Sequence, residues 1–80
     1  MQPGLALAML RFAEDATIHE HAAPFPIDVL CLEGRGWVSV DGEAAPLAAG
    51  QRVHWPANAM HRLWTDGSTM LTLMVEHVPR

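Results

Sequence analysis

The chain has 80 residues, which is the length of one small domain. It has five basic and nine acidic residues, and the basic residues form no continuous stretch. This composition argues against binding to nucleic acids and to anionic membranes. Half of the residues are apolar, and the core of so short a chain cannot bury them all. We therefore expect an oligomer, in which a second copy covers the remaining apolar surface.

The first predicted element, residues 5–12, is ambiguous. Its alanine, leucine and methionine favour a helix, but the rest of the chain is typical of short strands, so we predict a strand. The apolar run of residues 5–10 is too short for a signal peptide or a membrane span. Cys31 is the only cysteine, which excludes a disulfide within the chain. We therefore expect a cytoplasmic protein.

The remaining apolar segments have the length of strands, and glycine, proline and aspartate separate them. We predict strands at residues 27–33, 37–40, 51–55, 61–65 and 69–77, with turns at 41–42, 49–50 and 66–67. Many short strands at turn spacing indicate an all-β sandwich or barrel.

His19-Glu20-His21 is the first feature that carries chemistry. Residues i and i+2 of a strand point to the same face, where two imidazoles can chelate a metal ion. An isolated pair of this kind is more often two solvent-facing histidines. A second pattern changes that balance: Gly50, Pro56, Asn58 and His61 mark a strand, a corner and a histidine that opens the next strand.

With the Glu-Gly-x-Gly of residues 33–36, this layout resembles the two motifs of the cupin superfamily, over about residues 13–77. The first motif covers about residues 13–34 and the second about 50–65. The resemblance implies one domain over residues 1–80, an all-β, single-domain cupin jelly-roll barrel (a double-stranded β-helix). It also implies one metal ion held by His19, His21 and His61.

The family's carboxylate position departs from the pattern, because Ile27 stands where the first motif has glutamate. Asp28 is one residue out of phase and faces away from the metal unless a bulge turns it inward. His54 faces outward if Val53 and Trp55 fill the barrel. The sequence leaves open whether Asp28 or His54 replaces the missing carboxylate, and it predicts Glu33 and Glu76 as surface charges.

Three neutral imidazoles suit one divalent transition metal ion, such as Zn, Fe, Mn, Ni or Cu. A pocket beside it suits a small, largely apolar organic ligand; its expected lining is Ile27, Val29, Val53, Trp55 and Leu63. One hypothesis is a dioxygenase- or isomerase-like enzyme. The alternative is a non-catalytic module that senses a ligand or metal and works with a partner protein. The sequence supplies no obvious general base, so both stay open.

The distribution of apolar residues over the two faces of the predicted strands indicates a homodimer. In residues 27–33 one face carries Ile27, Val29 and Cys31, and the other carries Leu30 and Leu32. If the first face lines the barrel, Cys31 is a small core residue and the two leucines point outward. Residues 69–77 are also apolar on both faces. A sheet with one wet face alternates apolar and polar residues, so these strands indicate a second covered face.

Overall fold

The computed structural model describes residues 3–79, without the side chains of Pro3, residues 19–21 and Pro79. Its seven strands are β1 (Pro3–Phe12), β2 (Thr17–Ala22), β3 (Ile27–Val40), β4 (Glu43–Ala48), β5 (Arg52–Trp55), β6 (Met60–Trp64) and β7 (Met70–Pro79). The predicted all-β fold is confirmed, and residues 5–12 lie within a strand. The described residues form no helix long and apolar enough to cross a membrane.

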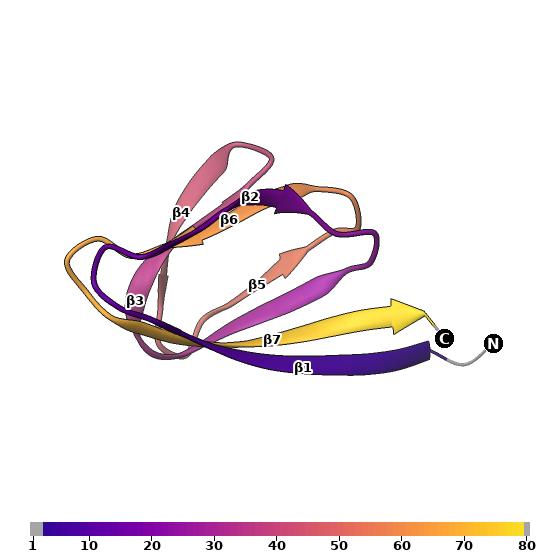
Figure 1. Ribbon diagram of the computed structural model, residues 1–80, viewed down its shortest axis with the longest axis horizontal. Coiled ribbons are helices and arrows are strands. Elements are labelled where there is room, and N and C mark those ends of the chain that lie inside the picture. The colour runs from indigo at the N-terminus through magenta and orange to yellow at the C-terminus, as the bar shows by residue number, and fades with distance from the viewer. Residues whose placement is uncertain (1–2, 80) are drawn as a thin grey trace.

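Two antiparallel layers share the long strand β3 and curl over each other (Figure 1). The first half of β3 pairs with β5 and β7, and β1 pairs with β7 at the edge of that layer. The second half of β3 pairs with β4 and β6, and β2 pairs with β6. This curled sheet is the jelly-roll architecture that the sequence predicts.

Strand β3 is continuous where two strands were expected at residues 27–33 and 37–40. It passes from one layer to the other at Gly34, whose φ of 73° lies in the left-handed region that favours glycine. A side chain at Gly34 would collide with the backbone of Thr69, and the Arg35 amide donates to the Thr69 carbonyl at 3.1 Å. Glycine therefore lets β3 cross close to the start of β7 without a break.

The predicted hairpin turn at Asp41-Gly42 is confirmed. The φ angles are 49° and 85°, the pair of positive values that a two-residue turn between twisted strands requires. It joins β3 to β4 and brings Glu43 opposite Val40.

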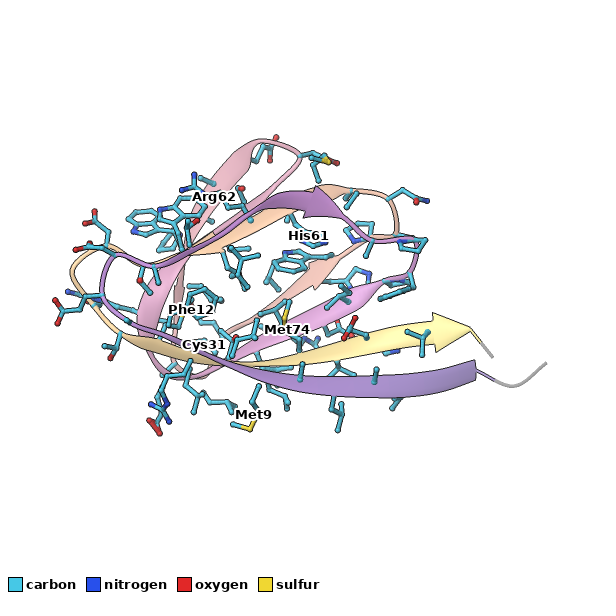
Figure 2. All side chains as sticks on the ribbon, viewed as in Figure 1. Met9, Phe12, Cys31, His61, Arg62 and Met74 are labelled. Atoms are coloured by element: carbon cyan, nitrogen blue, oxygen red, sulfur yellow. The ribbon has the colours of Figure 1, made fainter. Side chains whose placement is uncertain are left out.

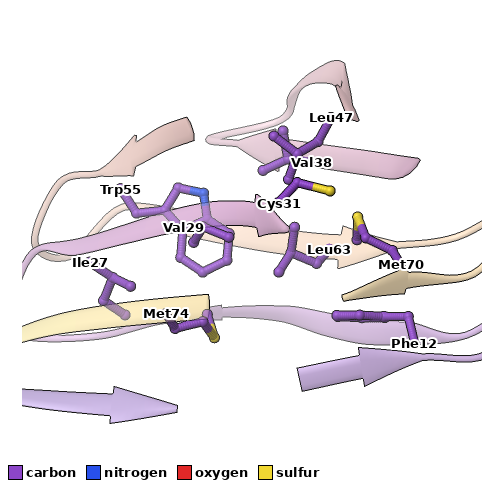
Figure 3. Packing of buried hydrophobic residues seen from close by; sticks show 10 residues of the cluster. All are labelled: Phe12, Ile27, Val29, Cys31, Val38, Leu47, Trp55, Leu63, Met70 and Met74. Atoms are coloured by element: carbon purple, nitrogen blue, oxygen red, sulfur yellow. The ribbon is translucent and has the colours of Figure 1, made fainter. Parts of the chain in front are cut away.

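The core lies between the two layers, as the side chains of both inner faces show (Figure 3). Its buried members are Phe12, Ile27, Val29, Cys31, Val38, Leu47, Trp55, Leu63, Met70 and Met74. The predicted phase of residues 27–31 is confirmed, and Cys31 is a core residue. Burial raises the pKa of the Cys31 thiol above its ordinary value, which keeps it protonated.

Candidate metal and ligand site

His61 occupies the space between the layers (Figure 2). Its side chain has no exposed surface, and its ring stacks on that of Trp55 with centroids 3.8 Å apart and planes 11° apart. His61 comes from β6 and Trp55 from β5 of the opposite layer. The stack therefore links the two layers and fixes the orientation of the imidazole.

Strand β2 places the backbone of the H-x-H motif beside His61. His21 is paired with His61 in the β2–β6 ladder, and Ile18 is paired with Leu63. Two residues of β2 thus stand opposite Arg62 alone, which is a β-bulge at residues 19–20. Side chains of a regular strand alternate between its two faces, and a β-bulge interrupts this alternation. The strand pattern therefore does not determine on which face His19 lies.

The side chains of His19 and His21 lie outside the described residues, so the three-histidine set stays a prediction. Within the described residues, no three His, Cys, Asp or Glu side chains are grouped so that they could hold a metal ion.

The five residues predicted to line the pocket all come from the inner faces. Ile27, Val29, Trp55 and Leu63 are buried, and Val53 packs against them. Their role as pocket lining stays a prediction. One polar atom among them is unusual: the indole Nε1 of Trp55 is buried and has no hydrogen-bond partner among the described residues.

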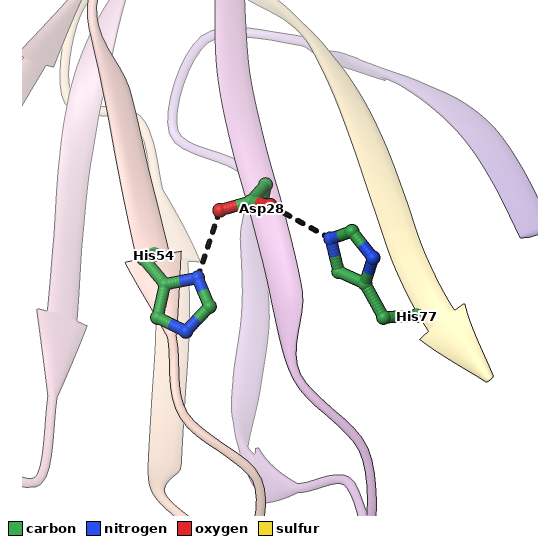
Figure 4. A network of polar contacts seen from close by, with 3 residues as sticks. All are labelled: Asp28, His54 and His77. Atoms are coloured by element: carbon green, nitrogen blue, oxygen red, sulfur yellow. Dashed lines mark hydrogen bonds and ion pairs between the residues drawn. The ribbon is translucent and has the colours of Figure 1, made fainter. Parts of the chain in front are cut away.

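Asp28 points to the outer face, where it joins two imidazoles (Figure 4). His54 Nδ1 lies 2.8 Å from Asp28 Oδ1, and His77 Nε2 lies 2.8 Å from Asp28 Oδ2. Hydrogen bonds from His54 and His77 hold the pKa of the Asp28 carboxyl below its ordinary value. His54 faces outward as predicted. Both open candidates for the missing carboxylate position therefore lie on the outer face, engaged with each other.

The sequence predicts Glu76 as a surface charge, but the structure places it differently. It is half-buried and stands opposite Ile27 on β7, in the same phase as the buried Met74 and Thr72. The glutamate therefore belongs to the inner face, whereas Glu33 is exposed as expected. Residues 69–77 are apolar on both sides, so their pattern could not assign the phase.

The architecture and these motif positions agree with a known family: the family model for the cupin domain matches residues 9–76. The chain belongs to the cupin family. No curated protein matches this cupin.

Solved structures give the same fold. A conserved protein of unknown function from Streptococcus pyogenes is 25% identical to this cupin with a TM-score of 0.87; the match covers 95% of this chain and 66% of that one. The polyketide cyclase RemF from Streptomyces resistomycificus is 19% identical with a TM-score of 0.84, covering 95% and 56%. A predicted oxalate decarboxylase from Thermotoga maritima is 17% identical with a TM-score of 0.83, covering 91% and 65%. This cupin thus spans between about half and two thirds of these proteins.

Proposed function

We propose that this cupin holds one divalent transition metal ion through His19, His21 and His61 and takes a small, largely apolar organic molecule beside it. The register supports part of this ligand set, because the β2–β6 ladder places the backbone of His21 directly opposite His61, whose side chain is buried between the layers. The donor chemistry fits Zn, Fe, Mn, Ni or Cu. A bound metal ion supplies a Lewis acid that polarises a carbonyl or enediol oxygen.

The buried Nε1 of Trp55 is the observation that carries the ligand proposal. A buried donor without an acceptor costs about 1–3 kcal/mol, and this one belongs to the ring that stacks on His61. A ligand oxygen that accepts this hydrogen bond removes that cost. The surrounding side chains of Ile27 and Leu63 are apolar and exclude water. The ligand that fits is therefore an apolar molecule with a carbonyl-type oxygen.

Glu76 is our candidate for acid–base work, because it brings a half-buried carboxylate to the inner face. A carboxylate near a divalent cation also raises the affinity for that cation through charge attraction. We therefore expect Glu76→Gln to raise the metal dissociation constant several-fold. The matched control is Glu33→Gln, which removes the same charge from an exposed position and should change the constant little. Equal constants for the two variants would remove Glu76 from the site.

The metal site is tested by reconstituting the purified, untagged protein and measuring affinity against a chromogenic chelator. We expect about one metal ion per chain in the wild type and loss of most of it in His61→Ala. His54→Ala is the control, since it removes an imidazole from the outer face. Equally weak binding by wild type and His61→Ala would show that His61 is not a ligand.

The ligand is tested with the metal-loaded protein and a panel of diketones, flavonols and acyl compounds. We expect Trp55→Phe to keep the stacked ring and the metal but to weaken ligand binding about tenfold, because one hydrogen bond in a dry site is lost. Turnover of a panel member supports an enzyme of dioxygenase or isomerase type. Tight binding without turnover supports the sensing module that works with a partner protein.

A further inference from the structure

A cavity of about 290 Å³ opens on the outer face of the layer that β2, β4, β6 and the second half of β3 form. Its walls come from β3, β4 and the loop between β6 and β7, and they include Arg35, Trp37, Pro46, Asp66 and Ser68. Trp37 and Pro46 stand opposite each other in the β3–β4 ladder and are both exposed, whereas both neighbours of Trp37 on β3 are buried. The cavity therefore lies on the other side of this layer from the core and the proposed metal site.

Trp37 forms the aromatic wall of the cavity, and contacts across neighbouring strands support its ring. Its indole is stacked on that of Trp64, with centroids 6.4 Å apart and planes 14° apart. The Arg62 guanidinium lies 4.4 Å from the centre of the Trp64 ring, and Arg62 Nε donates to Thr17 Oγ1 at 3.1 Å. A ring that is held in this way loses little conformational freedom when a ligand packs on it. Trp37 is still 40% exposed, so much of its indole is accessible to a ligand.

The polar part of the cavity carries one positive and one negative side chain. Arg35 Nε donates to Ser68 Oγ at 3.0 Å, which orients the guanidinium and leaves its terminal N–H groups available. Asp66 is exposed and, among the residues that the structure describes, forms no ion pair with Arg35. The cavity thus offers hydrogen-bond donors and acceptors without a net charge, which favours a neutral ligand.

We propose that this cavity binds the pyranose ring of a neutral sugar against Trp37. The C–H groups on one face of a pyranose carry small positive partial charges, which fit the negative π face of an indole. Hydroxyl groups both donate and accept hydrogen bonds, so neighbouring hydroxyls of the sugar can accept from Arg35 and donate to Asp66. The volume is close to the lower end of the range for small-molecule pockets, about 300–1,000 Å³, which suits a single ring.

Charged small molecules fit the cavity less well. An anion meets the negative charge of Asp66, and a cation meets the positive charge of Arg35. A zwitterionic amino acid needs both partners at one fixed separation, and these two exposed side chains are not tied to each other. A sugar tolerates their movement, because different hydroxyls can make the hydrogen bonds.

The test is a titration of the isotope-labelled protein, followed by NMR, with free pyranoses of the glucose, galactose and mannose series and with their methyl glycosides. We expect at least one sugar to bind with a dissociation constant of about 1 mM. Its binding should shift the amide signals of residues 35–37 and 66–68 and the indole N–H signal of Trp37. Binding of either form supports the proposal, and a preference between them distinguishes a free sugar from the end of a longer glycan.

Variants of exposed residues test the aromatic wall and the polar part separately. Trp37→Leu keeps an apolar side chain but has no π face, so it should weaken sugar binding at least about tenfold. Asp66→Asn lies in a surface loop and should weaken binding about threefold without changing the circular dichroism. Glu43→Gln is the matched control, because it removes an exposed carboxylate outside the cavity and should bind like the wild type.

Absence of binding by every sugar of the panel overturns the proposal. Tighter binding of phenylalanine or glycine betaine than of any pyranose overturns the ligand class, because the cavity would then select a zwitterion. Signal shifts confined to the surroundings of His61, or binding that appears only after zinc is added, overturn the location. The outer cavity contains no proposed metal ligand, so failure of the metal site leaves the expected results unchanged.

Discussion

The imidazoles on the inner and outer sides of the β1–β7–β3–β5 layer have opposite surroundings. His61, which comes from β6 of the other layer, lies on the inner side, has no exposed surface and stacks on the ring of Trp55. His54 and His77 lie on the outer side, where each is bonded to Asp28 and about half of each side chain meets solvent. The presence of a histidine therefore does not by itself indicate a metal site. The strand face on which the imidazole lies determines whether it is buried or hydrogen-bonded at the surface.

Strand β5 contributes neighbouring residues to both of these environments. His54 and Trp55 are consecutive residues, and strand alternation sends the first outward to Asp28 and the second inward to His61. A change that moves a carboxylate from one face to the other should therefore have large effects, and changes within one face should have smaller ones.

The largest effect is expected for Ile27→Glu, which places a carboxyl group on the inner face at a position only 4% exposed. In the metal-free protein an uncompensated buried charge should cost about 3–5 kcal/mol of unfolding free energy. Zinc should recover more stability in this variant than in the wild type, because the carboxylate adds a ligand. Chemical denaturation with and without zinc measures both effects.

Ile27→Gln is the control for that experiment, because glutamine has the same size as glutamate but cannot become an anionic ligand. It should lose stability without any extra recovery on adding zinc. The same recovery in the glutamate and glutamine variants would show that position 27 does not reach the metal.

A smaller effect, about 1 kcal/mol, is expected for Asp28→Asn on the outer face, where two hydrogen bonds to a charged acceptor are weakened. The folded-state pKa of Asp28 lies below its ordinary value of 3.8. Its stabilisation is therefore fully present above that value and is lost as the pH falls through the folded-state pKa. The difference in unfolding free energy between the wild type and the Asp28→Asn variant should shrink on going from pH 5 to pH 2.

Urea unfolding of both proteins at a series of pH values and one fixed protein concentration measures this difference. A difference that stays constant from pH 5 to pH 2 would contradict the assigned role of the two histidines.

The smallest change concerns Cys31, which is 2% exposed and whose thiol pKa is raised by burial. A buried, protonated thiol reacts slowly, so we expect negligible alkylation in the native protein at pH 8 and full alkylation in urea. Rapid alkylation of the native protein would place the thiol at an open site instead of in the core.

Local patterns predicted most of the fold. The Asp41-Gly42 turn and the phase of Ile27, Val29 and Cys31 are confirmed, because turn chemistry and period-two alternation act over a few residues. The continuity of β3 could not be predicted, because a glycine at position 34 is typical of a strand end. The structural reason for Gly34 is the close approach of Thr69, which lies 35 positions away in the chain.

The candidate site could be predicted less completely, for the same reason. The bulge in β2 follows from pairing with β6, and the Asp28–His77 bond joins residues 49 positions apart. Glu76 belongs to a strand with apolar residues on both sides, so only the register with Ile27 assigns its face. Motif spacing indicates which imidazoles to consider, whereas cross-strand pairing determines what stands beside them.

The central claim, a metal ion held by inner-face imidazoles, is tested most directly by X-ray absorption on the zinc-loaded protein. We expect nitrogen neighbours at about 2.0–2.1 Å with the multiple scattering of imidazole rings, and no sulfur at about 2.3 Å. The imidazole signal should be lost in His61→Ala and kept in the double variant His54→Ala, His77→Ala. An imidazole signal that survives in His61→Ala and disappears in the double variant would contradict the account, because the metal would then lie on the outer face.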